Sequence, residues 1–97
     1  MHLPPSAQNN IAAQIANFVR LNSTGYGAVA TRVGQARHPE AAIVAIAAIG
    51  QTDCTAKVAV HYNRLVYTSA TGTHISHPTR WADAGRIVCA LLRLEND

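Results

Sequence analysis

Apolar residues recur with helical spacing near the N-terminus. The stripe falls at positions i, i+4, i+7 and i+8 and consists of Ile11, Ile15, Phe18 and Val19. This spacing predicts an amphipathic helix over residues 7–21, with Ser6 as its N-cap. The opposite face is polar and carries the uncharged amides of Gln8, Asn10, Gln14 and Asn17.

Two shorter apolar segments follow. The side chains of residues 28–33 would alternate between the two faces of an extended segment, and this pattern predicts a strand. Residues 41–49 are apolar almost throughout and come directly after Pro39, which suits the first position of a helix. We therefore predict a helix over residues 41–49, with Gly50 ending it. A short buried strand over residues 43–46 is the alternative, because a brief apolar run has no decisive period.

The second half of the chain predicts a hairpin and a helix. Residues 55–70 alternate on both sides of a two-residue turn at Asn63-Arg64. One face of this hairpin carries Val58, Val60, Tyr62, Leu65 and Tyr67. The other carries Lys57, Ala59, His61, Val66 and Thr68. Helical spacing returns at Trp81, Ala84, Val88 and Leu91, which predicts a last helix from about Pro78 to Leu94.

These elements follow the order α-β-α-β-β-α within a single domain, residues 1–97. We expect an α+β fold in which a small antiparallel sheet of about three strands is packed on one face by three helices. Residues 1–5 are expected to form a flexible tail, and residues 95–97 a frayed end.

Composition excludes some classes of protein. No apolar run approaches the roughly 20 residues that a spanning helix needs, so we expect no membrane association. The first residues lack the basic and then apolar order of a signal peptide. Cys54 and Cys89 have no CxxC spacing, so we expect two buried thiols in a reduced, cytoplasmic protein. A single disulfide is the alternative.

Positive charge is distributed unevenly along the chain. The net charge is +3, and seven of the eight basic residues are arginine, which suits bidentate contact with phosphate or carboxylate. No acidic residue precedes Glu40, and none lies between Asp53 and Asp83. The residues expected to attract an anionic partner are Arg32, Arg37, Lys57, Arg64 and Arg80. Hydrogen bonds to it are expected from His61, His74 and His77.

The segment from Thr73 to Trp81 gathers imidazoles, a guanidinium, an indole and hydroxyls at the predicted start of the last helix. A helix N-terminus exposes free N–H groups and attracts anions. Two interpretations follow. Either His77 or Thr79 caps the helix, or an anion is held there by His74, His77 and Arg80.

The same residues do not predict a metal or catalytic centre. Zinc needs three or four converging ligands, and beyond His74 and His77 the candidates are scattered: His61, Cys54 and Cys89. Nucleophilic pairs can be drawn from Cys54 with His61, or from Ser76 with a histidine. Neither pair has the third group that orients the base. We expect no bound metal, no cofactor and no enzymatic activity.

The sequence therefore predicts a small, cytoplasmic, non-catalytic binding domain with a basic surface. Its expected partner is anionic, either nucleic acid or an acidic protein surface, and its size would suit a regulator or inhibitor encoded on a mobile element. The alternative is a homo-oligomer, such as a homodimer, whose apolar interface binds a protein or a small molecule. The salt dependence of binding would distinguish the two functions, because binding to nucleic acid weakens steeply as the salt concentration increases.

Overall fold

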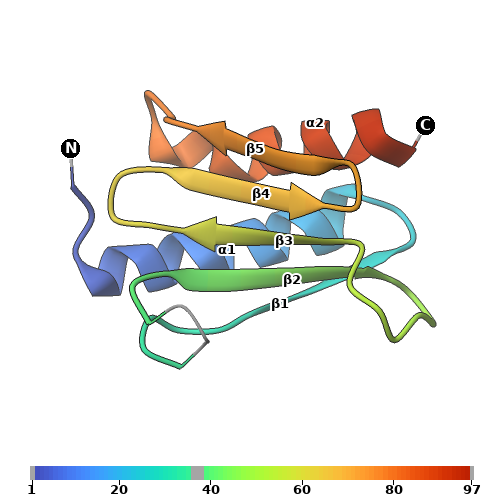
Figure 1. Cartoon of the computed structure of the whole chain (residues 1–97), viewed down its shortest axis with the longest axis horizontal. Coiled ribbons are helices and arrows are strands. Elements are labelled where there is room, and N and C mark those ends of the chain that lie inside the picture. The colour runs from blue at the N-terminus through green and yellow to red at the C-terminus, as the bar shows by residue number, and fades with distance from the viewer. Residues whose placement is uncertain (1, 36–38, 97) are drawn as a thin grey trace.

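A computed structural model describes residues 2–35 and 39–96 of the chain. Within these residues the chain forms two α-helices and one five-stranded sheet, shown in Figure 1. The elements in chain order are α1 (Pro5–Asn22), β1 (Tyr26–Ala30), β2 (Ala42–Ala48), β3 (Ala56–Val60), β4 (Leu65–Ser69), β5 (Gly72–Ser76), a 3-10 turn (Trp81–Asp83) and α2 (Ala84–Asn96).

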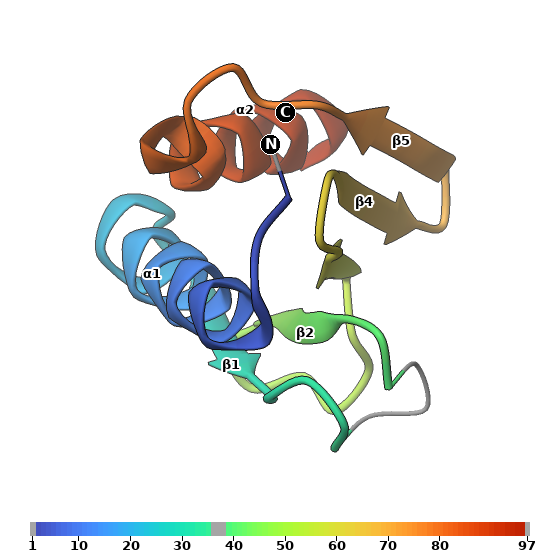
Figure 2. The ribbon, with the colours of Figure 1, turned by 90° about the vertical axis from the view of Figure 1, so that its left-hand side faces the viewer.

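The sheet is an antiparallel meander in which every strand pairs with the next one along the chain. Both helices lie on the same side of it, so the molecule has two layers (Figure 2). The α+β class and the helix-covered sheet are confirmed. The predicted three strands and three helices are wrong, because the described residues form five strands and two α-helices.

The predicted helix over residues 41–49 is the strand β2, so the alternative interpretation is confirmed in a longer form. Burial alternates along this strand, with Val44 and Ile46 fully buried and Ile43 and Ala45 half-buried between them. The strand pairs with β1 on one side and β3 on the other. The hydrogen bonds and side-chain contacts of these two ladders stabilise the strand by more than the helix propensity of its alanines would stabilise a helix.

The predicted hairpin is confirmed as β3 and β4, with a shift in register. The backbone N–H of His61 donates to the carbonyl of Arg64 at 3.0 Å, so the two turn residues are Tyr62 and Asn63 rather than Asn63 and Arg64. Val60 consequently pairs with Leu65. A register shift of two residues leaves the side chains of the two strands on their predicted faces. Tyr62, predicted on the apolar face, instead lies in the turn and is 44% exposed. Among the described residues only glycines have positive φ, so Asn63 does not adopt the positive φ that two-residue hairpin turns favour.

The predicted start of the last helix at Pro78 is also wrong. Residues Gly72–Ser76 instead form β5, and α2 begins only at Ala84, after the 3-10 turn. Gly72, with φ of 132°, permits the tight turn that returns the chain beside β4. Pro78 then disfavours helical backbone at His77, which keeps the segment extended.

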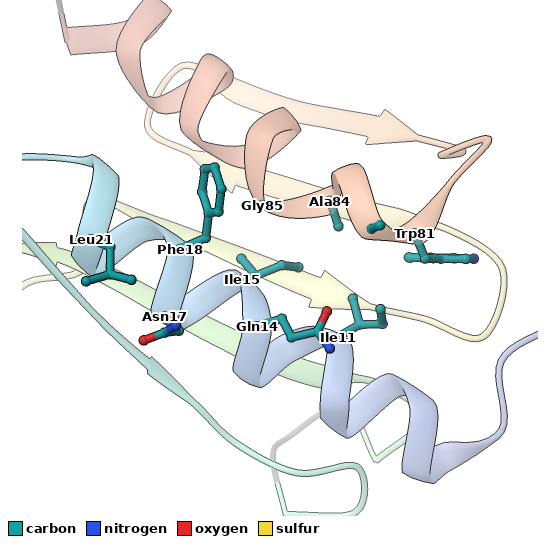
Figure 3. Close-up of a pocket in the computed structure, with 10 residues that line it drawn as sticks. Ile11, Gln14, Ile15, Asn17, Phe18, Leu21, Trp81, Ala84 and Gly85 are labelled. Carbon is teal, nitrogen blue, oxygen red and sulfur yellow. The ribbon is translucent and has the colours of Figure 1, made fainter.

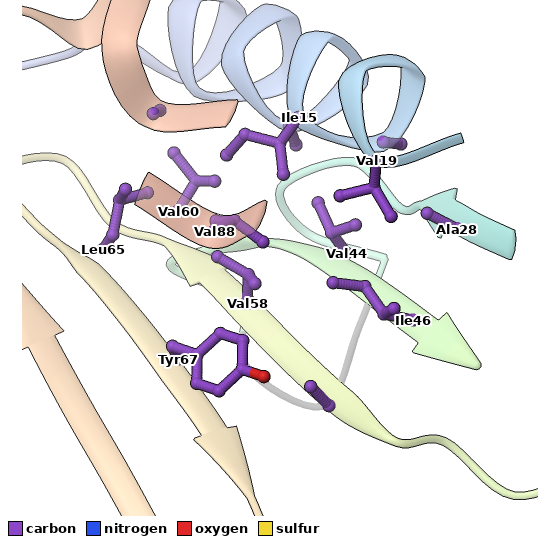
Figure 4. Packing of buried hydrophobic residues seen from close by; sticks show 14 of the residues in the cluster. Ile15, Val19, Ala28, Val44, Ile46, Val58, Val60, Leu65, Tyr67 and Val88 are labelled. Atoms are coloured by element: carbon purple, nitrogen blue, oxygen red, sulfur yellow. The ribbon is translucent and has the colours of Figure 1, made fainter. Parts of the chain in front are cut away.

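The core lies between the helices and the inner face of the sheet (Figure 4). Its largest fully buried side chains come from both layers and include Ile15, Val44, Ile46, Val58, Val60, Leu65, Val88 and Leu92. Full burial of such a side chain contributes about 1.5–3 kcal/mol. The predicted strand over residues 28–33 appears as the shorter β1, which contributes Ala28 to this core.

The start of α1 differs from its prediction in two respects. The helix begins at Pro5, and no side chain caps it, so Ser6 is not the N-cap. Gln8 does not lie on an exposed amide face, because only 3% of it is accessible. Its Nε2 donates to the carbonyl of Val60 at 2.9 Å and to that of Glu40 at 3.0 Å. One buried amide therefore joins α1 to the end of β3 and the approach to β2.

The two cysteines are free thiols in different environments. Cys89 is buried in α2 and accepts a hydrogen bond from the Ser23 hydroxyl at 3.4 Å. Cys54 is exposed in the loop between β2 and β3, so the prediction of two buried thiols is wrong for this residue.

Candidate interaction surfaces

Three of the described basic candidates, Arg32, Arg64 and Arg80, lie at the same end of the sheet, because β1, β3 and β5 all run toward it. Arg64 follows the β3–β4 turn, where its Nη1 donates to Asn63 Oδ1 at 2.9 Å. Arg32 follows β1 and Arg80 follows β5, and these two edge strands are four strand spacings, about 19 Å, apart. Lys57 lies near the opposite end of β3. Arg37 lies outside the described residues. These three residues are spread along the width of the sheet, and anion binding by them remains a prediction.

The segment around His77 contributes to a hollow rather than to a helix cap. A cavity of about 360 Å³ is lined by His2, Asn63, His77, Pro78, Thr79 and Trp81. His74 lies in β5, opposite Tyr67, and does not line it; nor does Arg80. No side chain caps the 3-10 turn after Arg80, so the capping interpretation of His77 or Thr79 is wrong. Asp83 places a carboxylate in this first turn, where it would repel a bound anion.

His2 and Leu3 lie against the β3–β4 turn. The Leu3 N–H donates to the carbonyl of Tyr62 at 2.6 Å, and the ring of His2 meets that of Tyr62 edge-on at 4.8 Å. His61 is half-buried beside them. The structure thus gathers His2, His61 and His77 at one end of the sheet, while His74 lies in the middle of β5.

A second hollow lies between the two helices (Figure 3). It has a volume of about 240 Å³, and its walls include Ile11, Phe18, Leu21 and Trp81. Phe18 closes it against Gly85, where the helices approach most tightly. The hollow is mainly a gap in the packing of α1 against α2, and its lining offers the amides of Gln14 and Asn17 as polar groups.

The face of the sheet turned away from the helices is largely apolar. We call it the outer face; the side chains it presents, by strand alternation, are Val29, Ile43, Ala45, Ala47, Lys57, Ala59, Val66, Thr68, Thr73 and Ile75. Val29 and Ile75, on the two edge strands, are 67% and 55% exposed. Lys57 is the one charged member of this set. No helix of the described residues covers the outer face.

The edge formed by β5 has free backbone groups. Because His61 and Arg64 form a hydrogen-bonded pair, the antiparallel alternation directs Leu65, Tyr67 and Ser69 toward β5. The same alternation turns the N–H and C=O groups of Thr73 and Ile75 away from β4. No residue in the described part of the chain bonds to these outward groups. An edge of this kind, without proline or charge, is a template for another strand.

The other edge of the sheet is occupied. In β1 the Gly25 carbonyl accepts from Ile49 and the Thr31 N–H donates to Ile43, so the backbone of Ala28 points outward. Arg20 of α1 reaches this edge, and its Nη1 donates to the Ala28 carbonyl at 2.7 Å. A guanidinium at this position obstructs the approach of a further strand.

An apolar stripe on α2 lies next to the open edge. Gly85 and Cys89 turn toward α1, and Val88 and Glu95 turn toward the sheet. On the side of α2 turned away from α1, large apolar side chains follow the spacing i, i+4 and i+7; they are Ile87, Leu91 and Leu94. Leu94 is 79% exposed, and the other two are half-buried. Figures 1 and 2 both show α2 beside β5, so helical periodicity directs this α2 stripe toward the β5 side.

Glu95 fastens the end of α2 to the β4–β5 hairpin. Its carboxylate accepts hydrogen bonds from Tyr67 Oη at 2.8 Å, from Ser69 Oγ at 2.6 Å and from the Thr71 hydroxyl. Partial desolvation alone would raise the pKa of Glu95, but the three hydroxyl donors outweigh it and lower this pKa. Burial, and then the bond to Glu95, raise the pKa of Tyr67. The carboxylate is therefore held charged and the phenol neutral.

We expect Glu95→Gln to destabilise the fold at neutral pH by about 1–2 kcal/mol, since a charged acceptor loses three hydroxyl donors at a partly exposed site. Folding lowers the pKa of Glu95. Its contribution to the free energy of unfolding is therefore fully present above the ordinary carboxyl pKa of about 4.3, and it is lost as the pH falls through the lower pKa of the folded state. Urea unfolding of both proteins from pH 7 to pH 3 should show the difference shrinking toward acid. Asp53→Asn, at an exposed loop carboxylate, is the control.

Residues 2–35 and 39–96 contain no group of three or more His, Cys, Asp or Glu side chains that could hold a metal ion. No helix in the same residues is long and apolar enough to cross a bilayer. Comparison with protein-family models finds no match, and no curated protein or solved structure matches the chain significantly.

Sequence reasoning missed the β5 edge and the α2 stripe. The alternating positions of Thr73 and Ile75 are typical of a strand such as β5, but the imidazoles and hydroxyls around them favoured a helix start. The α2 stripe is visible in the sequence as an apolar face that is too wide around the helix to be buried completely. Ile87 and Leu94 lie beside the part of this face that Val88 and Leu92 occupy.

Proposed function

We propose that this chain is a non-catalytic self-association domain, two copies of which join along the edges of β5. The observation that carries this proposal is the open edge of β5, with free backbone groups at Thr73 and Ile75, lying beside the partly exposed α2 stripe. The proposal follows the homo-oligomeric alternative rather than the anionic partner, since the open edge and the α2 stripe offer backbone and apolar groups and no charge.

The pairing that fits this edge is antiparallel about a two-fold axis at His74. Thr73 then lies opposite Ile75 of the partner subunit, and Ile75 opposite the partner's Thr73. Each of these pairs exchanges two hydrogen bonds, because both residues direct their backbone groups outward. The result is four new backbone bonds and one continuous sheet made from both copies.

The α2 stripe supplies the apolar part of the interface. Four backbone hydrogen bonds contribute about 4 kcal/mol in total, which only reaches the lower end of the 4–15 kcal/mol that association costs in lost freedom. The edge alone would therefore give a weak complex. The two-fold axis that pairs β5 with β5 also brings both α2 stripes to the same side of the joined sheet. Burial of Ile87, Leu91 and Leu94 there adds the apolar contribution that the edge lacks.

Two features favour a second copy over a chain of copies or a peptide. Arg20 obstructs the edge of β1, so a head-to-tail contact of β5 with β1, which would continue without end, is disfavoured. A single extended peptide would satisfy the edge of β5 but leave the α2 stripe uncovered. A two-fold dimer covers both.

The test is sedimentation equilibrium of the whole chain at several concentrations. The wild type should show reversible association, unchanged between 0.1 and 0.5 M salt (about 10 and 5 Å screening lengths) because the interface is not ionic. Leu94→Glu should weaken it at least about tenfold, the effect of 1.4 kcal/mol. Leu21→Glu, at a similarly exposed leucine on α1 (75% exposed), is the matched control and should have no effect.

A second variant examines the edge itself. Thr73→Pro removes one outward N–H without disturbing a bond to β4, as edge positions allow, and should also weaken association. A monomeric wild type at millimolar concentration would overturn the proposal. So would equal effects of Leu94→Glu and Leu21→Glu. Association that requires added nucleic acid and disappears in 0.5 M salt (a screening length of about 5 Å) would instead support the anionic partner.

A further inference from the structure

The outer face of the sheet is the largest surface that the proposed dimer leaves uncovered. We infer that two dimers pack their outer faces together, forming a four-copy sandwich of two long sheets. This inference rests on the dimer proposed above, because joining the β5 edges places two outer faces side by side in one surface.

The composition of the outer face suits contact with a second sheet. Its central positions are small or aliphatic, with Ala45, Ala47 and Ala59 beside Ile43 and Val66. Sheets that pack face to face lie about 10 Å apart, with interdigitating side chains. Alanine positions next to larger aliphatic side chains provide the hollows and ridges that such packing needs.

The size of the face indicates what covers it. The flat footprint of the outer face is about 24 by 17 Å, or about 400 Å². It follows from five strands about 4.8 Å apart, each five residues long at about 3.4 Å per residue. A standard interface buries about 800 Å² on each partner. Because the accessible surface over side chains exceeds this flat footprint, one copy offers at least about half of a standard interface, and two copies joined at β5 offer at least about all of it. This match favours a second dimer as the occupant.

The position of Lys57 is compatible with this contact. It lies next to the first residue of β3, one position from the end of that strand. Its long side chain can therefore extend to the rim, with its stem against the apolar face and its ammonium group in water. The row nearer the β3–β4 turn is entirely apolar and runs across four strands through Ile43, Ala59, Val66 and Ile75. We expect this row to lie at the centre of the contact.

The experiment measures the mass of the intact chain by sedimentation equilibrium in three proteins. The wild type should reach four copies at high concentration. Val66→Lys, which places a charge in the apolar row, should stop at two copies, and Val29→Lys, at an exposed site of the same face, should shift the same equilibrium in the same direction. Leu21→Lys on α1 is the control and should still reach four.

Each remaining outcome has a defined meaning. If the wild type stops at two copies, or Val66→Lys and Val29→Lys still reach four, the packing of outer faces is overturned while the β5 dimer stands. If Leu94→Glu reaches the wild-type mass but Val66→Lys gives half of it or less, the β5 dimer is overturned and with it this inference. If Leu94→Glu gives single copies and Val66→Lys gives pairs, both interfaces are supported.

Discussion

Replacing Gln8 by alanine is expected to destabilise the fold by about 2–4 kcal/mol. The change removes two hydrogen bonds, from Gln8 Nε2 to the carbonyls of Glu40 and Val60. Each buried hydrogen bond contributes about 1 kcal/mol, and the cavity left by the side chain adds to the cost. The higher helix propensity of alanine recovers only a few tenths of a kcal/mol. Urea unfolding followed by circular dichroism would measure the difference.

Gln14→Ala provides the control for this prediction. Gln14 is an exposed amide on the same helix, and its substitution should change stability by less than about 0.5 kcal/mol. Equal effects at the two positions would show that the buried amide does not join α1 to the sheet. The variant Gln8→Leu, which fills the volume without donating, should remain destabilised because the two hydrogen bonds from Gln8 are lost.

Replacing Gly85 by alanine is expected to destabilise the fold by about 1–3 kcal/mol, as overpacking does. A Cβ atom at this position would lie 2.8 Å from both Cβ and Cγ of Phe18. Phe18 Cβ is fixed to the backbone of α1, so a new rotamer cannot relieve the contact and the helices must separate. Alanine favours a helix interior by about 1 kcal/mol over glycine, and the clash must exceed this gain.

Thermal unfolding of Gly85→Ala beside Ala13→Gly separates these two effects. Ala13 is an exposed position of α1, so Ala13→Gly should report the loss of helix propensity alone, about 1 kcal/mol. Both variants are expected to unfold at lower temperature than the wild type. A Gly85→Ala protein more stable than the wild type would mean that α1 and α2 can move apart freely.

The type of an element was predicted correctly where only one of its faces is buried, because its apolar residues then recur with a clear period. The β3–β4 hairpin and α1 are such elements, and their apolar stripes largely match the buried sets. The strand β2 is half-buried on its second face as well, so its sequence is apolar throughout and resembles a buried helix. Its identity depends on pairing with β1 and β3, which are non-local interactions that a local pattern does not contain.

The candidate sites were harder to predict for a related reason. Arg32, Arg64 and Arg80 are placed by strand ends and turns, so their separation depends on the order of the strands in the sheet. The edge of β5 became visible only after Gly72–Ser76 was recognised as a strand. Gln8 shows the same limit, because its role depends on two carbonyls 32 and 52 residues away along the chain.

The meander order of the sheet has a consequence for how the chain folds. Each strand finds its partner immediately before or after it in sequence, so the ladders form through short loops that cost little entropy to close. The contact of α2 with α1 instead joins the two ends of the chain. Domains with local pairing fold faster than those with distant pairing. The docking of α2 is therefore the step at which the topology delays folding most.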